Sequence, residues 1–336
     1  MCMKVLFIGG NGNISWWCVQ EALEHGYEVY EMNRGLTRTT RRAIQPNVKT
    51  IICDVRNSED LKECLKGFYF DVVCDFICYN DSHAKTMIDA FSGKCGQYIV
   101  ISSECVYRDR SGAIALNENS AKFDSEEISG YIQGKLLLEK EFHRAFYDIK
   151  FPLTIVRPGA TYDNLVFTPL GRNDFTVPQM ILDGYPYLMV GDGTNFHIPL
   201  HSEDFAKAFV QLIGNRNTIG EDYLITADQR VSWNDMADAL FEALDIKERN
   251  VLHFQRDDVI RRLEIGDIAL FDETLNSYNY SNVKIKMMAP DWKQMINYYD
   301  GIGRCIKWLR EDGRRQRVNS ELYNKLVLLL EDKCCQ

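Results

Sequence analysis

The sequence lacks the features of membrane, secreted and nucleic-acid-binding proteins. None of its apolar runs approaches the length of a membrane span. With 39 Lys and Arg against 48 Asp and Glu, the formal net charge is −9, which argues against a general nucleic-acid surface because phosphate binding depends on cations. The N-terminus runs directly into a predicted strand and leaves no room for a signal peptide, so we expect a cytoplasmic protein.

Disulfide bonds and metal sites are not indicated either. The 11 cysteines are scattered through predicted strands and helices, their number is odd, and no Cys-x-x-Cys pair occurs. The 6 histidines do not cluster at the spacing of metal ligands. We therefore expect reduced, mostly buried thiols and no structural metal.

What is present is an alternation of short apolar strands and helical patterns. This alternation predicts an α/β protein built on a doubly wound parallel sheet. We expect a nucleotide-binding domain over residues 1–164 that also takes in about 198–226, and a smaller, mostly helical substrate lobe from 165–197 and 227–336. Ser58 and Ser202 are expected to cap helices, and Trp292 to Tyr299 shows a helical pattern.

A glycine turn opens the chain between a predicted strand from Lys4 and a helix. Gly9 and Gly12 fit the dinucleotide fingerprint, in which the backbone approaches a pyrophosphate and the helix N-terminus stabilises its charge. Asn13 and Ile14 follow in the same turn, and Ser15 replaces the glycine that usually packs helix against strand. By itself, this pattern also fits a Gly/Asn-rich turn without a ligand.

The end of the second strand should lie beside the adenosine ribose of a dinucleotide. An acidic residue there binds the 2′-hydroxyl of NAD, whereas an arginine accommodates the 2′-phosphate of NADP. The position holds neutral Asn33, and Arg34 and Arg38 follow it. We expect NADP or NAD as cofactor and favour NADP; the alternative is a solvated basic loop.

A second constellation follows the fifth strand. The strand runs into Ser102 and Ser103, and a later helix carries Tyr131 and Lys135 four residues apart, on one face. A nearby ammonium favours the phenolate, so we expect Lys135 to lower the tyrosine pKa. The Ser103 hydroxyl, across the cleft, is expected to hold a substrate oxygen.

With these motifs, the chain resembles the extended short-chain dehydrogenase/reductase family, in its NAD-dependent epimerase/dehydratase branch, from Met3 to about Ile225. The resemblance also rests on Val156-Arg157-Pro158 and Gly191-Asp192-Gly193. It implies a Rossmann-type sheet and a homodimer formed through the helix bearing Tyr131. It further implies the catalytic group Ser103, Tyr131 and Lys135, with Asp54 at the adenine and with Val55, Pro158, Tyr131 and Lys135 among the cofactor-binding residues.

The sequence departs from the family pattern at positions that the resemblance places near the substrate. The Asp-Glu pair of the family's dehydratases is replaced by Glu104 and Cys105, so ordinary sugar dehydration is not expected. Cys105 resembles the thiol base of some epimerases and is a candidate catalytic residue, although we favour a small core thiol at the strand end. Ala160 and His197 stand where the family places an asparagine and an arginine near the substrate diphosphate. Glu104, Tyr162 and His197 remain candidate substrate residues.

These observations favour an NAD(P)-dependent oxidoreductase or epimerase. Its partner is expected to be a small molecule, a sugar or sugar-nucleotide-like hydroxyl compound, and hydride transfer would be assisted by Tyr131. Two alternatives belong to other classes: a catalytically idle NADP-binding regulatory protein, and an RNA-binding relative of the chloroplast type. The acidic balance of the chain disfavours the latter.

Overall fold

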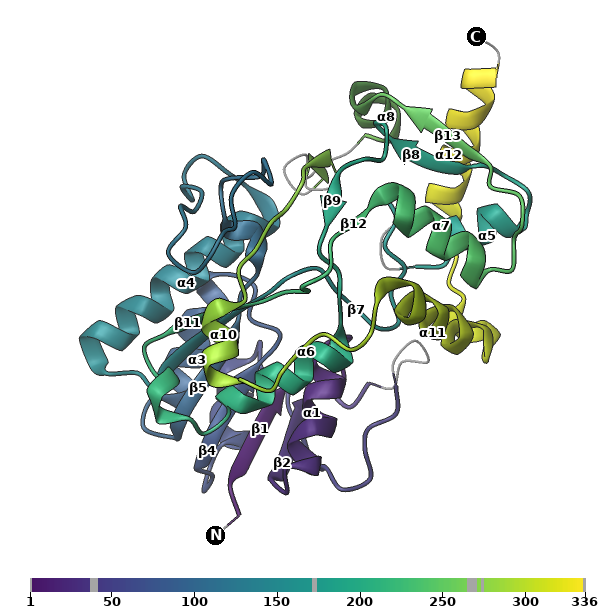
Figure 1. Ribbon diagram of the computed structural model, residues 1–336. Coiled ribbons are helices and arrows are strands. Elements are labelled where there is room, and N and C mark those ends of the chain that lie inside the picture. Colours follow the sequence, from purple (N-terminus) through teal and green to yellow (C-terminus); the bar gives the residue numbers. More distant parts are fainter. Residues whose placement is uncertain (1, 37–41, 171–173, 265–270, 273–274, 335–336) are drawn as a thin grey trace.

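The computed structural model describes residues 2–36, 42–170, 174–264, 271–272 and 275–334. Within these ranges, its centre is a seven-stranded sheet of order β11-β6-β5-β4-β1-β2-β3 (Figure 1), and every pair of neighbours is parallel. The predicted doubly wound parallel sheet is confirmed. Its strands are β1 (Lys4–Ile8), β2 (Glu28–Asn33), β3 (Lys49–Ile52), β4 (Phe70–Asp75), β5 (Cys95–Ile101), β6 (Leu153–Pro158) and β11 (Asp222–Ile225).

Both faces of the sheet are buried, because a layer of helices covers each of them. Successive side chains of a strand point to opposite faces and therefore pack with different layers. Val5 and Phe7 of β1 pack with the first helix layer, whereas Leu6 and Ile8 pack with the second. The first layer contains α1 (Ser15–Glu24) and α6 (Ser202–Phe209). The second contains α2 (Ser58–Cys64), α3 (Asp81–Phe91) and α4 (Gly130–Ile149).

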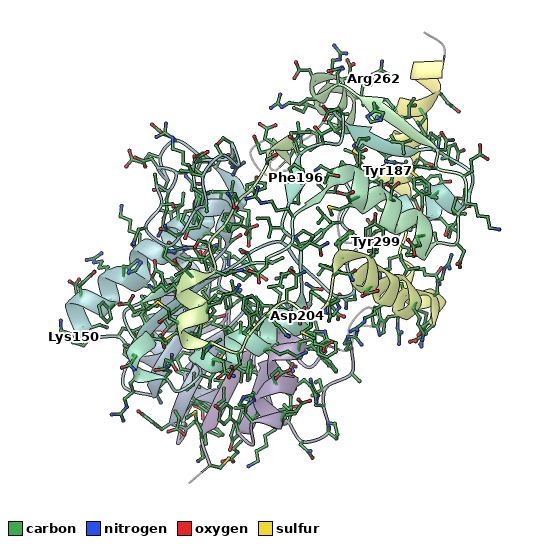
Figure 2. The ribbon with its side chains drawn as sticks, in the orientation of Figure 1. Lys150, Tyr187, Phe196, Asp204, Arg262 and Tyr299 are labelled. Carbon is green, nitrogen blue, oxygen red and sulfur yellow. The ribbon has the colours of Figure 1, made fainter. Side chains whose placement is uncertain are left out.

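The C-terminal lobe has its own core and lies at the carboxyl ends of the strands (Figure 1). Figure 2 shows Tyr187 inside this lobe, and Lys150 at the far end of α4, on the opposite side of the molecule. The lobe is not only helical, because β8 (Tyr187–Val190) and β13 (Val251–Phe254) form a parallel pair. Its helices are α5 (Thr176–Leu182), α7 (Trp233–Ala243), α8 (Arg256–Leu263), α11 (Tyr298–Arg310) and α12 (Ser320–Cys334).

Short strand pairs and one helix connect the two cores. β7 (Thr161–Tyr162) pairs with β10 (Leu200–His201), and β9 (Phe196–His197) pairs with β12 (Val231–Ser232). The helix α10 (Val283–Met288) packs against β11. The chain therefore passes repeatedly between the sheet and the lobe.

Two predicted helix caps are wrong by one residue. The side chain of Asn57, not that of Ser58, caps α2 by accepting hydrogen bonds from the backbone N–H groups of Glu59 and Asp60. The His201 imidazole, not the Ser202 hydroxyl, caps α6 by accepting from the N–H of Glu203. In both places the capping side chain belongs to an extended residue just before the helix, where an acceptor reaches the free N–H groups.

The helix predicted from Trp292 to Tyr299 is also wrong, since α11 begins only at Tyr298. The Asp204 carboxylate accepts hydrogen bonds from the backbone N–H groups of Met295 (2.9 Å) and Ile296 (2.7 Å). These contacts take donors that a helix would use internally, so a side chain distant in sequence overrides the local periodicity.

Candidate active site

A cleft of about 1310 Å³ lies between the carboxyl edge of the sheet and the C-terminal lobe. The residues lining it come from the glycine turn, from the ends of β2 and β3, and from the segment after β5. Tyr131 and several side chains of the lobe complete the lining. Most of the predicted site residues line this one cleft: Gly9, Gly12, Asn13, Ile14, Asn33, Arg34, Asp54, Val55, Ser103, Glu104, Cys105, Tyr131 and His197.

The glycine turn has the geometry of a phosphate cradle. Gly9 has φ +75°, and a Cβ placed on it would lie 2.5 Å from Cγ2 of Ile77. Ser15 is more than a packing variant, because its hydroxyl donates to the Gly9 carbonyl and accepts from the Gly12 N–H, both at 2.7 Å. The Ser15 hydroxyl thus holds the turn in place, and Gly9 and Gly12 bring its backbone to the cleft without a side chain at these two positions, which fits a pyrophosphate.

Asn13 links this turn to the other side of the cleft. Its Nδ2 donates to the carbonyl of Thr161 at 3.2 Å, and its Oδ1 accepts from the N–H of Asn164 at 3.4 Å. The side chain therefore ties the turn to the region of β7.

At the ribose end, the structure adds a residue that the sequence reasoning missed. Glu31 lines the cleft although only 1% of it is exposed, and its Oε1 accepts from Nδ2 of Asn33 at 3.1 Å. Burial raises the pKa of Glu31. A charged residue inside a strand that is otherwise buried was the available signal. Arg34 is exposed, and Arg38 lies outside the described residues.

Asp54, expected to contact an adenine, lies two residues after the end of β3. Its Oδ1 accepts from the N–H of Arg56 at 3.0 Å, and its carbonyl accepts from the N–H of Asn57 at 2.9 Å. Val55 beside it is 4% exposed, so the two residues form a fixed rim with one polar and one apolar side chain.

Lys135 lies beneath the cleft, where 1% of it is exposed. Its Nζ donates to the carbonyls of Cys78 and Ile101, both at 2.8 Å, and lies 5.6 Å from the ring centroid of Tyr131. Burial lowers the pKa of Lys135. Two of the three ammonium hydrogens are thus bound to backbone at the carboxyl edge of the sheet.

The expected depression of the Tyr131 pKa is wrong. The pKa of Tyr131 is raised well above its ordinary value by burial first, and then by the neighbouring Cys105 and Glu104. A hydrogen bond to Ser103 acts in the opposite direction and is outweighed. Tyr131 therefore carries its proton at neutral pH, and the site presents a proton donor.

Ser103 connects this tyrosine to an acidic residue. Its hydroxyl donates to Oε2 of Glu104 at 2.9 Å, and its oxygen accepts from the N–H of Cys105 at 3.3 Å. Since Ser103 also hydrogen-bonds to Tyr131, the phenol, the hydroxyl and the carboxylate form a continuous chain. Cys105 itself is 3% exposed.

A buried ionic network fixes α4, the helix that carries Tyr131 and Lys135. Arg157 on β6, with 0% of its side chain exposed, donates to both oxygens of Glu139 at 2.7 and 2.9 Å. Asp222 on β11 also accepts from Arg157 (2.5 Å), and Lys122 pairs with Glu139 at 2.7 Å. Glu139 is one helical turn after Lys135, so the network sets the position of the α4 face that carries Tyr131 and Lys135.

The lobe closes the other end of the cleft with aromatic side chains. The His197 ring lies 4.5 Å from that of Trp233 and 5.6 Å from that of Tyr278, centroid to centroid, and all three side chains line the cleft. Pro158 and Tyr162 are not in the lining. Tyr162 is fully buried and packs against Tyr298, so this geometry gives it a place in the lobe core.

Arg42 is a second cleft residue that the sequence reasoning missed. It donates through Nε and Nη2 to the two oxygens of Asp163, both at 2.7 Å, and its guanidinium lies within 5.4 Å of the ring centroids of Trp16, Trp17 and Trp308. It therefore joins the segment after β2 to the lobe.

In the described ranges, no group of His, Cys, Asp and Glu is arranged to hold a metal ion. None of the helices in these ranges has both the length and the hydropathy of a membrane span.

Known proteins are similar to this chain at low sequence identity. The chain is 22% identical over 309 residues to the chloroplast stem-loop binding protein of 41 kDa b from Arabidopsis thaliana, covering 89% of this chain and 77% of the relative. A dTDP-glucose 4,6-dehydratase from Bacillus anthracis in complex with NAD superimposes with a TM-score of 0.72 at 16% identity, covering 93% and 97% of the two chains.

A UDP-glucuronic acid 4-epimerase from Bacillus cereus in complex with NAD gives a TM-score of 0.71 at 19% identity, covering 92% of this chain and 99% of the epimerase. Both structures contain NAD, and the preference for NADP expected from Arg34 finds no support in them. The family model described as "NAD dependent epimerase/dehydratase family" matches residues 5–226. The chain belongs to the NAD dependent epimerase/dehydratase family.

Proposed function

We propose that the protein is a nicotinamide-dinucleotide-dependent oxidoreductase or epimerase that acts on a hydroxyl or carbonyl group of a sugar or sugar-nucleotide-like compound. The observation that carries this proposal is that Ser103 and Tyr131 line the same cleft as the glycine turn, with the buried ammonium of Lys135 5.6 Å from the centroid of the Tyr131 ring. Family membership and the NAD-bound dehydratase and epimerase structures support it.

The residues at the cleft would divide the work as follows. The glycine turn would hold the pyrophosphate, Asp54 would contact the adenine, and Lys135 would reach the nicotinamide ribose. The bound nicotinamide supplies hydride exchange with the substrate carbon. Tyr131, protonated at rest, would give its proton to the substrate oxygen, and Ser103 would orient that oxygen. Glu104, which is partly exposed, would take up a proton from solvent and pass it through the Ser103 hydroxyl to the Tyr131 phenolate.

The test replaces Tyr131 with phenylalanine. Without the hydroxyl, turnover should fall by about 10² to 10⁴ while NAD binding is retained, because general acid catalysis contributes that much. Turnover is followed by the absorbance of the reduced cofactor and by chromatography of a panel of UDP- and dTDP-sugars and sugar phosphates. The matched control is Tyr147→Phe on the same helix, where the side chain is 68% exposed. Wild-type turnover in the Tyr131 variant would contradict the mechanism.

A second candidate function is RNA stem-loop binding, favoured by the likeness to the Arabidopsis chloroplast protein over 89% of the chain. The net charge of −9 opposes it. Binding to a labelled stem-loop at low salt, with affinity that falls steeply as salt rises, would support it. Absence of binding at low salt would remove it.

A further inference from the structure

The end of the cleft that the C-terminal lobe closes is built around the short strand β9 (Figure 1). His197 lies on this strand, and the two backbone carbonyls before it hold the neighbouring aromatic residues. The N–H of Trp233 donates to the carbonyl of Asn195 at 3.3 Å, and the N–H of Tyr278 donates to that of Phe196 at 3.0 Å. His197, Trp233 and Tyr278 are at most 9% exposed. These three side chains form an aromatic wall that the fold itself holds in place.

The side chains beside the aromatic wall are mostly aliphatic or aromatic. Those that line the cleft from the lobe and its connections are Leu165, Phe167, Met236 and Tyr280. Towards the sheet, Glu104 adds a carboxylate beside Ser103 and Tyr131. A ligand bound at this end therefore meets apolar surface and a negative charge.

The cations that line the cleft belong to its cofactor half. In the described part of the chain they are five arginines and no lysine, namely Arg34, Arg42, Arg56, Arg314 and Arg315. Arg34 follows β2, and Arg56 donates to the carbonyl of Ile77, whose side chain lies against the glycine turn. Arg42 and Arg315 both contact the Trp308 ring, and Arg42 also contacts Trp16 in the helix after the glycine turn. Arg314 forms an ion pair with Asp312 next to them.

Arg110 comes close to the substrate end without lining the cleft. Its Nη2 donates to the carbonyl of Cys105 at 3.5 Å, and its guanidinium lies 4.9 Å from the ring centroid of Phe123. Arg110 therefore contacts backbone and an aromatic ring outside the lining.

Backbone donors at this end are also engaged. The helix α7 begins in the aromatic wall, at Trp233, and a helix N-terminus commonly binds phosphate. Asn234 donates its N–H to the carbonyl of Gly193 at 3.0 Å, and Asp235 donates to the Ser232 hydroxyl at 3.1 Å. Together with the bond from Trp233, the first three N–H groups of α7 thus have acceptors within the protein. A phosphate group would have to displace them, and the Asp235 carboxylate in the same turn would repel it.

These features favour a ligand without charge. Proteins bind phosphate and diphosphate groups with Arg, Lys or the N–H groups of a helix N-terminus, and the described lining near the aromatic wall contains neither of these side chains. Apolar and aromatic walls with a few polar groups suit uncharged rings. We infer that the substrate end of the cleft binds an uncharged sugar or glycoside, without a phosphate or diphosphate group, whose ring packs on the aromatic wall. The inference rests on the proposed function and names its substrate class.

The experiment measures binding to the full chain by isothermal titration calorimetry. The protein is first saturated with NAD, so that nucleotides cannot occupy the glycine turn. The uncharged probes are the phenyl β-D-glycosides of glucose, galactose and mannose, and the charged probes are UDP, UDP-glucose and glucose 1-phosphate. The wild type should bind one of the uncharged probes about tenfold more tightly than any charged probe, or better.

Two substitutions in the aromatic wall sharpen the test. Trp233→Ala should weaken binding of the glycoside about tenfold, because the ring loses its packing surface. Tyr299→Ala is the matched control: this aromatic side chain of the same lobe is 38% exposed and does not line the cleft, so the affinity should not change. His197→Arg places a guanidinium in the wall and should strengthen binding of UDP about tenfold.

The results separate this inference from the proposed function. Binding of UDP or UDP-glucose to the wild type as tight as that of the glycosides would overturn the inference, as would binding of none of the glycosides. Either result leaves the proposed function standing if NAD binds. Unchanged glycoside affinity in a folded Trp233→Ala variant would also overturn it, and the wild-type comparison decides if that variant does not fold. Absence of NAD binding would contradict the proposed function and the inference with it.

Discussion

Replacing Arg157 with methionine removes the central cation of the network that fixes α4 against the sheet. Burial raises the pKa of Glu139, but Arg157 and Lys122 outweigh burial and hold this pKa at about 2 instead of 4.5. Since one pKa unit corresponds to about 1.4 kcal/mol, the carboxylate form of Glu139 is favoured by a net of about 3 kcal/mol, after the opposing effect of burial is included. Breaking a buried ion pair from one side costs about 3–5 kcal/mol. We expect Arg157→Met to lower the free energy of unfolding by about 3 kcal/mol.

The assay is urea unfolding at neutral pH, followed by circular dichroism and tryptophan fluorescence. The double variant Arg157→Met/Glu139→Met should recover most of the loss, because the penalty comes from leaving a charge buried without its partner. A loss below about 1 kcal/mol, or a double variant as unstable as the single one, would refute this reasoning.

The same network predicts a pH dependence. Because the pKa of Glu139 is lower in the folded protein than its ordinary value of 4.5, its stabilising contribution is fully present above about pH 4.5 and is lost as the pH falls towards 2. The stability advantage of the wild type over Glu139→Gln should therefore shrink over this range.

Three further substitutions test packing, two on α11 in the lobe and one at the glycine turn. Gly301→Ala places a Cβ 2.0 Å from the hydroxyl of buried Tyr162, so it should lower the free energy of unfolding by about 1–3 kcal/mol. At Gly303, on the same helix, a Cβ meets no atom within 4 Å. Gly303→Ala should therefore leave the free energy of unfolding unchanged or raise it by up to about 1 kcal/mol. A thermal melt compares them, and equal effects would contradict the packing. Ser15→Ala removes both hydrogen bonds that brace the glycine turn and should cost about 1–2 kcal/mol in urea unfolding; an unchanged midpoint would show that the brace is dispensable.

The sequence was sufficient for features that depend on local pattern. The strand–turn–helix around Gly9 and the parallel order of the sheet follow from periodicity, glycine and crossover rules. The four-residue spacing of Tyr131 and Lys135 likewise predicted a shared helix face.

Long-range packing decided what the sequence could not predict. Arg42 pairs with Asp163, 121 residues later, and no local pattern marks either residue. The place of Glu31 at the cleft depends on Gly10, because a Cβ there would lie 2.8 Å from Cγ of Glu31. The direction in which the Tyr131 pKa moves depends on burial, Cys105 and Glu104, which come together only once the cleft is assembled.

The core of the C-terminal lobe joins segments from distant parts of the chain: Phe175 and Met180 pack in the same cluster as Leu326 and Leu329 of α12. The chain leaves the ribosome with its N-terminus first. All seven strands can therefore pair into the sheet once Ile225 has emerged. The apolar side chains of α5, by contrast, lack part of their partners until α12 has been made. During synthesis, the nascent chain therefore passes through a state in which the sheet is complete and the lobe still exposes apolar surface, the kind of surface that chaperones bind.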